Sequence, residues 1–238
     1  MKKINNLKIK IFADGADLTK ISHLNNKKYI AGFTTNPSLM KSSNVKNYET
    51  FSKKLLKIVK KKSISFEVTS DDISEMEIQA YKINSWGKNV FIKIPFTNSK
   101  GKKNLKLIKK LSHNNIKLNI TALFTYKQVL EVYRVLNKNS ESYLSIFAGR
   151  IADTGIDPSI IIKQTSKLVK KNRKIKILWA SCREIYSIFQ ADKLNCDIIT
   201  VPYSLLSKLK LIGKNLNIYS VETSRDFFKD SKDIKFNL

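Results

Sequence analysis

The sequence has few of the side chains on which many active sites depend. It contains two cysteines and two histidines in 238 residues. Cys182 and Cys196 have the spacing of neither a disulfide framework nor a zinc site, which fits a reducing compartment. His23 and His113 lie far apart in polar segments. A histidine-centred triad and a zinc site are therefore not favoured, and we expect no metal.

Long apolar runs are also missing. No stretch approaches the roughly 18 consecutive apolar residues that a membrane-spanning helix needs. The basic start at Met1 is followed by an apolar run that is too short for a signal peptide and ends at Asp14. The segment Ser99-Lys-Gly-Lys-Lys103 lacks the first glycine of a P-loop, so we interpret it as a turn. We expect a cytoplasmic protein that does not act at a membrane.

Acidic residues are scarce, because 19 Asp and Glu face 45 Lys and Arg, for a formal net charge of +26. The positive electrostatic field of such a charge is typical of proteins that bind nucleic acid, anionic membranes or phosphorylated substrates. The lysines are dispersed, however, with no basic arm and no interleaved aromatic residues to stack bases. We therefore expect no nucleic-acid partner and interpret the excess as a bias in residue usage, although the field would help to capture a sugar phosphate. A non-catalytic basic barrel that binds nucleic acid is the alternative from another class.

Apolar residues are sufficient for a folded core, since 42% of the chain is hydrophobic and 10% aromatic. Strand-like and helix-like patterns alternate along the sequence. Strands are expected at 8–13, 29–34, 64–68, 89–97, 116–124, 143–147, 175–180 and 197–201; helices are expected at 17–23, from 35 onward, and at 51–60, 72–83, 102–111, 126–136, 160–169, 183–191, 205–211 and 223–228, with a loop at 149–158. These units predict one α/β domain over residues 1–238, a (β/α)8 TIM barrel with an additional C-terminal helical segment.

A single lysine interrupts the apolar run Asn89-Val-Phe-Ile-Lys-Ile-Pro-Phe-Thr97. Lysine is rarely buried without a reason, and its removal from water favours the neutral amine that attacks carbonyl groups. Lys93 could instead point outward, but its place near the C-terminal end of a strand favours a reactive role, because barrel active sites lie at that end. The same rule selects Asp14, Thr34, Asn36, Glu67, Asn119, Thr121, Ser145, Arg150, Ser181 and Arg183. This set suits Schiff-base chemistry on a phosphorylated polyhydroxy carbonyl compound.

Simpler roles compete for several of these residues. Asp14 and Asp17 could each be a helix N-cap, and we keep that interpretation for Asp17. Arg150 and Arg183 could form surface salt bridges, and Glu67 could pair with a surface lysine. The strand-end positions of the arginines, and the apolar strand around Glu67, favour functional roles.

Seven motifs, in this order, resemble those of the transaldolase family. They are Phe12-Ala-Asp-Gly-Ala16, Gly32-Phe-Thr-Thr-Asn-Pro-Ser-Leu39, Phe66-Glu-Val68, Ile92-Lys-Ile-Pro-Phe-Thr97, Asn119-Ile-Thr121, Ser145-Ile-Phe-Ala-Gly-Arg-Ile151 and Ala180-Ser-Cys-Arg183. By its length the chain is similar to the compact branch of that family, which includes fructose-6-phosphate aldolase.

The resemblance implies that Lys93 forms an imine with a ketose phosphate and retains a dihydroxyacetone unit as an enamine. Asp14 would take the proton of the C4 hydroxyl, and Glu67 would move protons through a water held with Thr121. No metal or organic cofactor is implied, because the imine itself is the electron sink. We also expect a homo-oligomer. The other implied roles are substrate contacts by Asn36, Asn119 and Ser145, support by Thr34, and phosphate binding by Arg150, Ser181 and Arg183.

Two residues indicate which of the two activities of the resembling family, transferase or lyase, this sequence matches. Glu67 and Phe147 are of the transaldolase type, whereas fructose-6-phosphate aldolase carries Gln and Tyr at the matching positions. The resemblance thus implies a transaldolase of the non-oxidative pentose phosphate pathway; an aldolase-like lyase that releases dihydroxyacetone, or an enzyme with a changed sugar phosphate substrate, is the alternative. The chain departs from the family pattern at Gly15, Ile146, Glu184 and Trp179. We expect the Trp179 ring to narrow or remodel the pocket.

Overall fold

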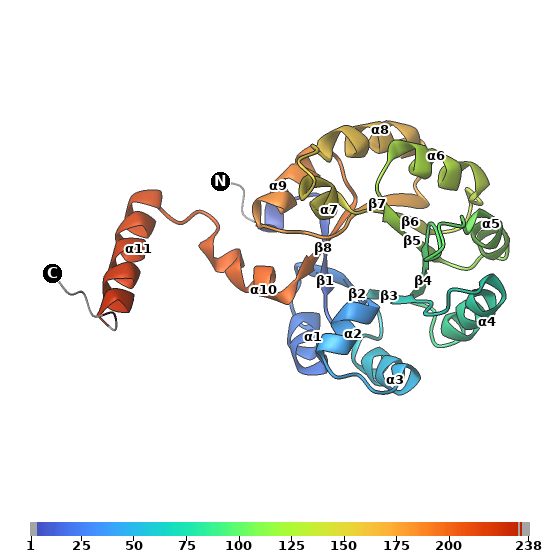
Figure 1. The fold of residues 1–238 in the computed structure, drawn as a ribbon, viewed down its shortest axis with the longest axis horizontal. Helices are drawn as coiled ribbons and strands as arrows, with labels where there is room; N and C mark the ends of the chain where they lie inside the picture. Colours follow the sequence, from blue (N-terminus) through green and yellow to red (C-terminus); the bar gives the residue numbers. More distant parts are fainter. Residues whose placement is uncertain (1–3, 233, 235–238) are drawn as a thin grey trace.

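The computed structural model describes residues 4–232 and residue 234, and its centre is a closed barrel of eight parallel strands. Each strand pairs with the next one along the chain, and β8 closes the barrel by pairing with β1 (Figure 1). The strands are β1 (Lys10–Asp14), β2 (Ile30–Thr34), β3 (Ser63–Glu67), β4 (Val90–Pro95), β5 (Leu118–Leu123), β6 (Ser142–Ile146), β7 (Ile175–Trp179) and β8 (Ile198–Pro202). This architecture confirms the predicted (β/α)8 TIM barrel.

Most of the helices connect the strands and lie around the outside of the barrel, whereas the last two helices follow the last strand (Figure 1). They are α1 (Leu18–Asn25), α2 (Pro37–Ser42), α3 (Tyr48–Ile58), α4 (Ile73–Asn84), α5 (Leu105–His113), α6 (Tyr126–Val135), α7 (Ala148–Ala152), α8 (Ser159–Val169), α9 (Tyr186–Lys193), α10 (Tyr203–Leu206) and α11 (Leu216–Ser231), with short 3-10 turns η1 (Ile4–Asn6) and η2 (Ser207–Leu211). Asp17 caps α1 by accepting the backbone N–H groups of Thr19 and Lys20, as predicted.

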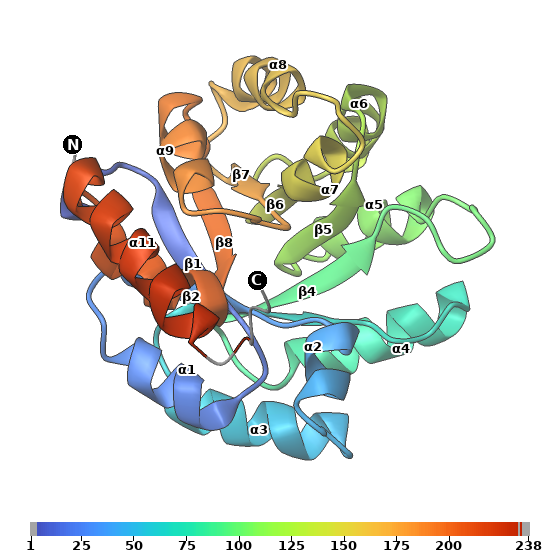
Figure 2. The ribbon, with the colours of Figure 1, turned by 60° about the vertical axis from the view of Figure 1, so that its left-hand side comes forward.

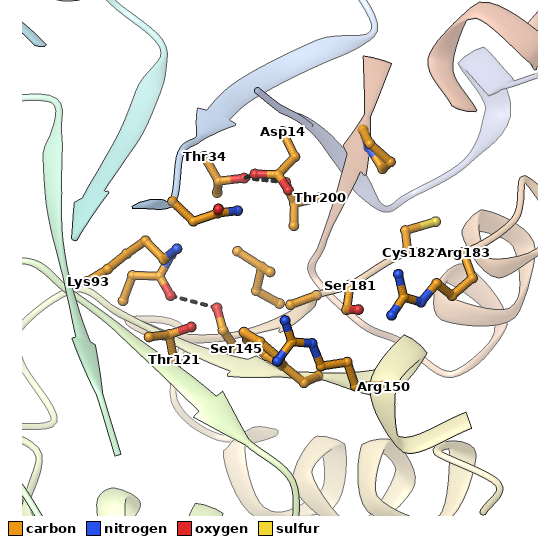
Figure 3. Close-up of a pocket in the computed structure, with 16 residues that line it drawn as sticks. Asp14, Thr34, Lys93, Thr121, Ser145, Arg150, Ser181, Cys182, Arg183 and Thr200 are labelled. Atoms are coloured by element: carbon orange, nitrogen blue, oxygen red, sulfur yellow. Dashed lines mark hydrogen bonds between the residues drawn. The ribbon is translucent and has the colours of Figure 1, made fainter. Parts of the chain in front are cut away.

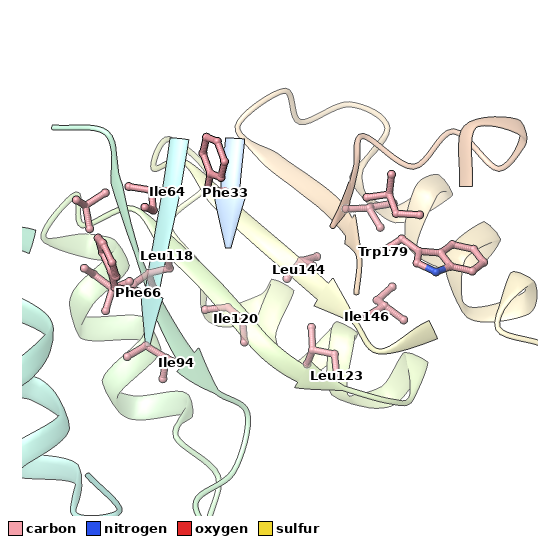
Figure 4. Close-up of a cluster of buried hydrophobic side chains, with 14 of the residues drawn as sticks. Phe33, Ile64, Phe66, Ile94, Leu118, Ile120, Leu123, Leu144, Ile146 and Trp179 are labelled. Atoms are coloured by element: carbon pink, nitrogen blue, oxygen red, sulfur yellow. The ribbon is translucent and has the colours of Figure 1, made fainter. Parts of the chain in front are cut away.

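Most strands are largely apolar on both faces because one face packs against the helices while the other fills the barrel. Ile120 and Ile146 belong to the large core between strands and helices, part of which Figure 4 shows. Inside the barrel, Phe91 and Tyr143 stack with ring centroids 4.1 Å apart, and Phe12 meets Tyr143 edge-on at 6.0 Å. Phe91 and Tyr143 lie near the starts of β4 and β6. Aromatic rings therefore fill the N-terminal end of the barrel, and the polar site lies toward the other end.

Two helical segments differ from the prediction. The expected loop at 149–158 contains α7, because Gly149 is part of this helix and packs closely against the Ser181 backbone instead of ending the helix. At the C-terminus α11 has 16 residues, whereas the sequence pattern predicts a helix only at 223–228. The apolar residues of α11 are spread around the helix, so the periodicity that marks a packed helix is weak here.

The helix α11 extends away from the barrel, to which η2 and α10 connect it (Figure 1). In Figure 2, turned so that this side comes forward, α11 lies in front of the barrel. None of the residues of this helix is buried, and Leu216, Phe227 and Phe228 are 78%, 70% and 68% exposed. Within the part of the chain that the structure describes, no helix combines the length and apolar character needed to cross a membrane.

Candidate active site

A cavity of about 210 Å³ opens among the C-terminal ends of the strands (Figure 3). Ten of the eleven site residues predicted from the sequence line it, and they come from β1, β2, β4, β5 and β6 and from the segments that follow β2, β6 and β7. The eleventh, Glu67, contacts one of these ten. The lining consists of Asp14, Thr34, Asn36, Lys93, Asn119, Thr121, Ser145, Phe147, Arg150, Leu178, Ala180, Ser181, Cys182, Arg183, Thr200 and Pro202.

The amine of Lys93 lies in the interior of the protein, and the residue is only 7% exposed. Its Nζ donates hydrogen bonds to Glu67 Oε2 and to the carbonyl oxygen of Thr35, both at 2.8 Å. The register explains the first contact, because Lys93 of β4 is directly paired with Glu67 of β3. Removal of one partner of a buried ion pair strongly destabilises a protein, because it leaves the other charge buried and unpaired. The contact also places Glu67 at a distance from the amine that permits proton exchange.

Asp14 lies at the end of β1, beside Thr34 at the end of β2. The Thr34 hydroxyl donates to Asp14 Oδ1 at 2.7 Å, and Thr34 Oγ1 also shares a hydrogen bond with Thr200 Oγ1 of β8. Burial raises the pKa of the Asp14 carboxyl above its usual 3.8, while the Lys93 ammonium and the bond from Thr34 act in the opposite direction. Asp14 is thus a carboxylate whose neutral form is favoured relative to an exposed aspartate, and it faces the same cavity as Lys93.

A chain of neutral hydrogen-bonding groups forms the wall next to Lys93. The amide of Asn119, which pairs with Lys93 across β4 and β5, donates to Ser65 Oγ at 3.0 Å and accepts from Ser145 Oγ at 2.6 Å. Because both ends of the amide are satisfied, its orientation is fixed. Thr121 lies two residues further along β5 and lines the same wall.

Asn36 has a structural role as well as a place in the cavity. It is the N-cap of α2, where its Oδ1 accepts the backbone N–H of Leu39 at 2.9 Å. The capping bond fixes the side chain at the start of the helix, and Pro37 at the first helical position reinforces that start. The amide nitrogen of Asn36 is the group suited to donate to a substrate hydroxyl.

Two arginines lie at the outer side of the cavity, near Ser181 (Figure 3). Arg150 is on α7, with its guanidinium 5.6 Å from the centroid of the Phe147 ring. Arg183 follows β7 and pairs with Asp153 through Nη2 and Oδ2 at 2.6 Å. Ser181 has a left-handed backbone, with φ of 62°. Planar guanidinium groups bind phosphate with two parallel hydrogen bonds, so this corner has the chemistry of a phosphate site.

A close contact between Gly149 and the Ser181 segment holds this corner together. A Cβ atom added to Gly149 would lie 1.6 Å from the carbonyl oxygen of Ser181 and 3.0 Å from Cγ of Arg183. The glycine lets α7, which carries Arg150, approach the segment that carries Ser181 and Arg183. The helix and the segment after β7, which are distant in sequence, thereby present their side chains to one region.

The expectation that Trp179 narrows the pocket is wrong. Trp179 is 3% exposed and belongs to the core between strands and helices, where it is paired in register with Ile146 (Figure 4). Its neighbours Leu178 and Ala180 line the cavity instead. Successive residues of a strand point to opposite faces, so the ring lies on the helix side of β7 and leaves the cavity unchanged.

The other departures from the family pattern also lie away from the cavity lining. A Cβ atom added to Gly15 would have no neighbour within 4 Å, so a larger residue would fit there. Ile146 is fully buried in the core outside the barrel, and Glu184 is exposed. These three positions give no reason to expect altered chemistry at Lys93.

The sequence reasoning missed two polar residues of the site. Thr200 lines the cavity and Ser65 orients Asn119, and both are at most 5% exposed. Thr200 stands within an otherwise apolar strand, which is the signal that identifies Lys93, so the strand pattern of β8 marks it. Ser65 alternates with apolar residues between Ser63 and Glu67 in β3, and no such signal distinguishes it.

The fold and this cavity define a (β/α)8-barrel protein whose polar groups converge at the C-terminal ends of the strands, where enzymes of this fold carry their active sites. The family model described as Transaldolase/Fructose-6-phosphate aldolase matches residues 11–238. The chain belongs to this family of aldolase- and transaldolase-type enzymes.

Relatives agree with this assignment. A protein of Nitrosopumilus maritimus named "Probable transaldolase" is 34% identical over 203 residues, which cover 84% of this chain and 87% of that protein. A protein of Thermoplasma volcanium with the same name is 36% identical over 205 residues, covering 84% and 87%. Among solved structures, dihydrodipicolinate synthase from Rhodopseudomonas palustris has a TM-score of 0.55 at 13% identity, covering 94% of this chain and 79% of that one. A 2,3-dimethylmalate lyase has a TM-score of 0.56 at 10% identity, covering 98% and 84%. At such low identity these structures are similar in fold alone.

Proposed function

We propose that the protein is a transaldolase that transfers a dihydroxyacetone unit from a ketose phosphate to an aldose phosphate through a Schiff base on Lys93. The observation that carries this proposal is the buried Lys93 amine, 2.8 Å from the Glu67 carboxylate and facing the same cavity as Asp14. A carboxylate beside the amine can receive the protons that the amine must lose before and after it attacks a carbonyl carbon.

Imine formation joins Lys93 Nζ to C2 of the ketose and releases water. Glu67 is placed to protonate the departing hydroxyl, since it contacts Nζ itself. Thr121 lines the same wall and is suited to hold the water. The resulting iminium carries the positive charge that later accepts electrons, so no metal or organic cofactor is needed for this step.

Cleavage of the carbon–carbon bond follows when Asp14 removes the proton of the C4 hydroxyl. The O–H electrons form the new carbonyl group, the C3–C4 bond breaks, and its electrons move into the iminium to give an enamine. The aldose phosphate leaves. Attack of the enamine on a second aldose phosphate, with Asp14 returning the proton, reverses these steps, and hydrolysis frees the product.

The remaining side chains suit the recognition of a sugar phosphate. Asn119 and Ser145 present oriented polar groups on the wall beside Lys93. Arg150, Ser181 and Arg183 are suited to bind the phosphate group at the outer side of the cavity. We propose sedoheptulose 7-phosphate or fructose 6-phosphate as the donor, in the non-oxidative pentose phosphate pathway of the cytoplasm.

Support for a transferase over a lyase comes from Glu67 and Phe147, which match the transaldolase type, and from relatives that are named "Probable transaldolase". The test supplies fructose 6-phosphate with and without erythrose 4-phosphate and follows both products. A transaldolase releases glyceraldehyde 3-phosphate and forms sedoheptulose 7-phosphate only when the acceptor is present. Steady release of free dihydroxyacetone without an acceptor would identify the lyase instead.

A further inference from the structure

Three oxygen-bearing side chains form a line across neighbouring strands at the cavity wall. Asp14 of β1 accepts from Thr34 Oγ1 of β2 at 2.7 Å, and Thr34 Oγ1 also contacts Thr200 Oγ1 of β8 (Figure 3). The barrel brings them together because β1 pairs with β2 on one side and with β8 on the other. Thr34 and Thr200 are only 3% and 5% exposed. The three hydrogen-bonded side chains therefore lie within the protein, and Asp14 is the last residue of the line.

The direction of these hydrogen bonds follows from a count of protons. An ionised carboxylate only accepts, and a threonine hydroxyl has one proton to donate. When Asp14 is ionised, Thr34 must give its proton to Asp14. The contact between the two threonines then requires Thr200 to donate to Thr34.

We propose that Thr200 is a positioning residue for Asp14, which acts through Thr34 to hold the carboxylate ionised and aimed at the substrate hydroxyl. This inference rests on the proposed role of Asp14 as the base that cleaves the sugar. A hydroxyl that itself accepts a hydrogen bond is a better donor, because successive bonds in a chain polarise one another. Thr200 thus strengthens the bond that Thr34 makes to the carboxylate.

Loss of the Thr200 donor has a defined effect on pH dependence. A weaker bond to the charged form raises the pKa of Asp14, so the enzyme needs a higher pH to ionise its base. The acid side of the kcat profile should move upward by about one pH unit, which corresponds to a fall in kcat of about tenfold at a fixed acid pH. The KM should change little, because Thr200 acts on Asp14 and not on the substrate.

The experiment compares Thr200→Val, which keeps the shape and removes the hydroxyl, with Thr200→Ser, which keeps the hydroxyl. Thr34→Val removes the direct donor and should shift the profile at least as far. Thr165→Val is the matched control, because Thr165 is a fully buried threonine of α8 that bonds only to the Ile161 carbonyl in its own helix. The rate of fructose 6-phosphate cleavage is measured from pH 5 to 9, with erythrose 4-phosphate as acceptor.

The expected result is an upward shift of the acid limb in Thr200→Val, recovery of most of the kcat in Thr200→Ser, and no shift in Thr165→Val. An unmoved acid limb in Thr200→Val would overturn the inference. So would a rise in KM alone, because it would mean that Thr200 contacts the substrate. If Thr200→Val does not fold, Thr200→Cys compared with Thr200→Ser makes the same test, since a thiol is the weaker donor.

A separate measurement keeps this inference apart from the proposed function. Borohydride reduction with fructose 6-phosphate traps the imine on Lys93, and this trapping does not depend on Asp14. If the wild-type protein forms no adduct, the proposed function fails. If the adduct forms but Thr200→Val keeps the wild-type acid limb, only the role of Thr200 fails.

Discussion

Replacement of Gly149 by alanine should displace the loop proposed to bind phosphate. The added Cβ would lie 1.6 Å from the Ser181 carbonyl oxygen, whereas real Cβ atoms essentially never approach a neighbour closer than 3.0 Å. One backbone segment must therefore move by the difference, about 1.4 Å. The obstacle is backbone and not the end of a flexible side chain, so a rotamer change cannot relieve it.

The displacement has two measurable consequences. Overpacking of a tight contact costs about 1–3 kcal/mol in the free energy of unfolding. A misplacement of about 1 Å at a binding group can reduce catalysis about 100-fold. We therefore expect Gly149→Ala to be less stable in urea unfolding and to lose about 100-fold in kcat/KM with glyceraldehyde 3-phosphate as acceptor. With unphosphorylated glyceraldehyde, which does not use the arginine corner, the loss should be much smaller.

Gly15→Ala is the matched control for stability, because an added Cβ at Gly15 meets nothing within 4 Å. Reduced freedom of the unfolded chain should leave this variant as stable as the wild type or more stable by about 0.4–1 kcal/mol. If Gly149→Ala retains wild-type stability, the close contact with Ser181 does not constrain the loop. If both acceptors lose activity equally, the segment around Ser181 is not a phosphate site.

Three further predictions concern other parts of the molecule. Asp14→Asn should raise the free energy of unfolding at pH 7, because burial raises the pKa of Asp14 and the ionised carboxylate therefore destabilises the folded protein at that pH. The gain in stability over the wild type should disappear as the pH falls toward 3.8, and equal stability of the two proteins at pH 7 would contradict the prediction. Trp179→Phe should keep kcat/KM within about twofold of the wild-type value, since the Trp179 ring faces the helices. A large change in KM would show that the ring reaches the pocket. The homo-oligomer expected from the sequence stays a prediction, and we propose that the exposed apolar side chains of α11 form its interface. Phe227→Glu with Phe228→Glu should then give a smaller particle in light scattering, and an unchanged mass would exclude α11 from the interface.

Much of the fold could be predicted from the sequence because the signals are local. Strands buried on both faces give short apolar runs, and the turns and helices between them give breakers and a different period. The strand-end rule then selected Lys93, Asp14 and their neighbours, since every strand of a parallel barrel ends on the same face. A resemblance in motif order pointed to the same residues.

The errors arose where the answer depended on register or on distant contacts. Trp179 was expected in the pocket because it precedes Ala180 and Ser181, yet a shift of one residue in a strand reverses the face. Gly149 was taken as part of a loop, whereas its role depends on the carbonyl of Ser181, which lies 32 residues further along the chain. The positioning role proposed for Thr200 depends on its contact with Thr34, which the closure of the barrel brings beside it.

The direct contact between Lys93 and Glu67 was likewise not predicted. The resemblance implies that Glu67 acts through a water held with Thr121, which stays a prediction; the structure adds a direct contact, with the carboxylate 2.8 Å from Nζ. The pairing of β3 with β4 in this particular register produces the contact. An apolar run with one acidic residue indicates a buried carboxylate but does not identify its partner.

The central claim is that the buried amine of Lys93 forms a covalent imine with a ketose phosphate. The direct test incubates the protein with fructose 6-phosphate, adds borohydride and measures the intact mass, in parallel with Lys93→Ala. Lys117→Ala is a suitable control, because Lys117 belongs to the opposite end of the barrel, before β5. We expect one adduct per chain in the wild type and in Lys117→Ala and none in Lys93→Ala. No adduct in the wild type, or an adduct that persists in Lys93→Ala, would contradict it.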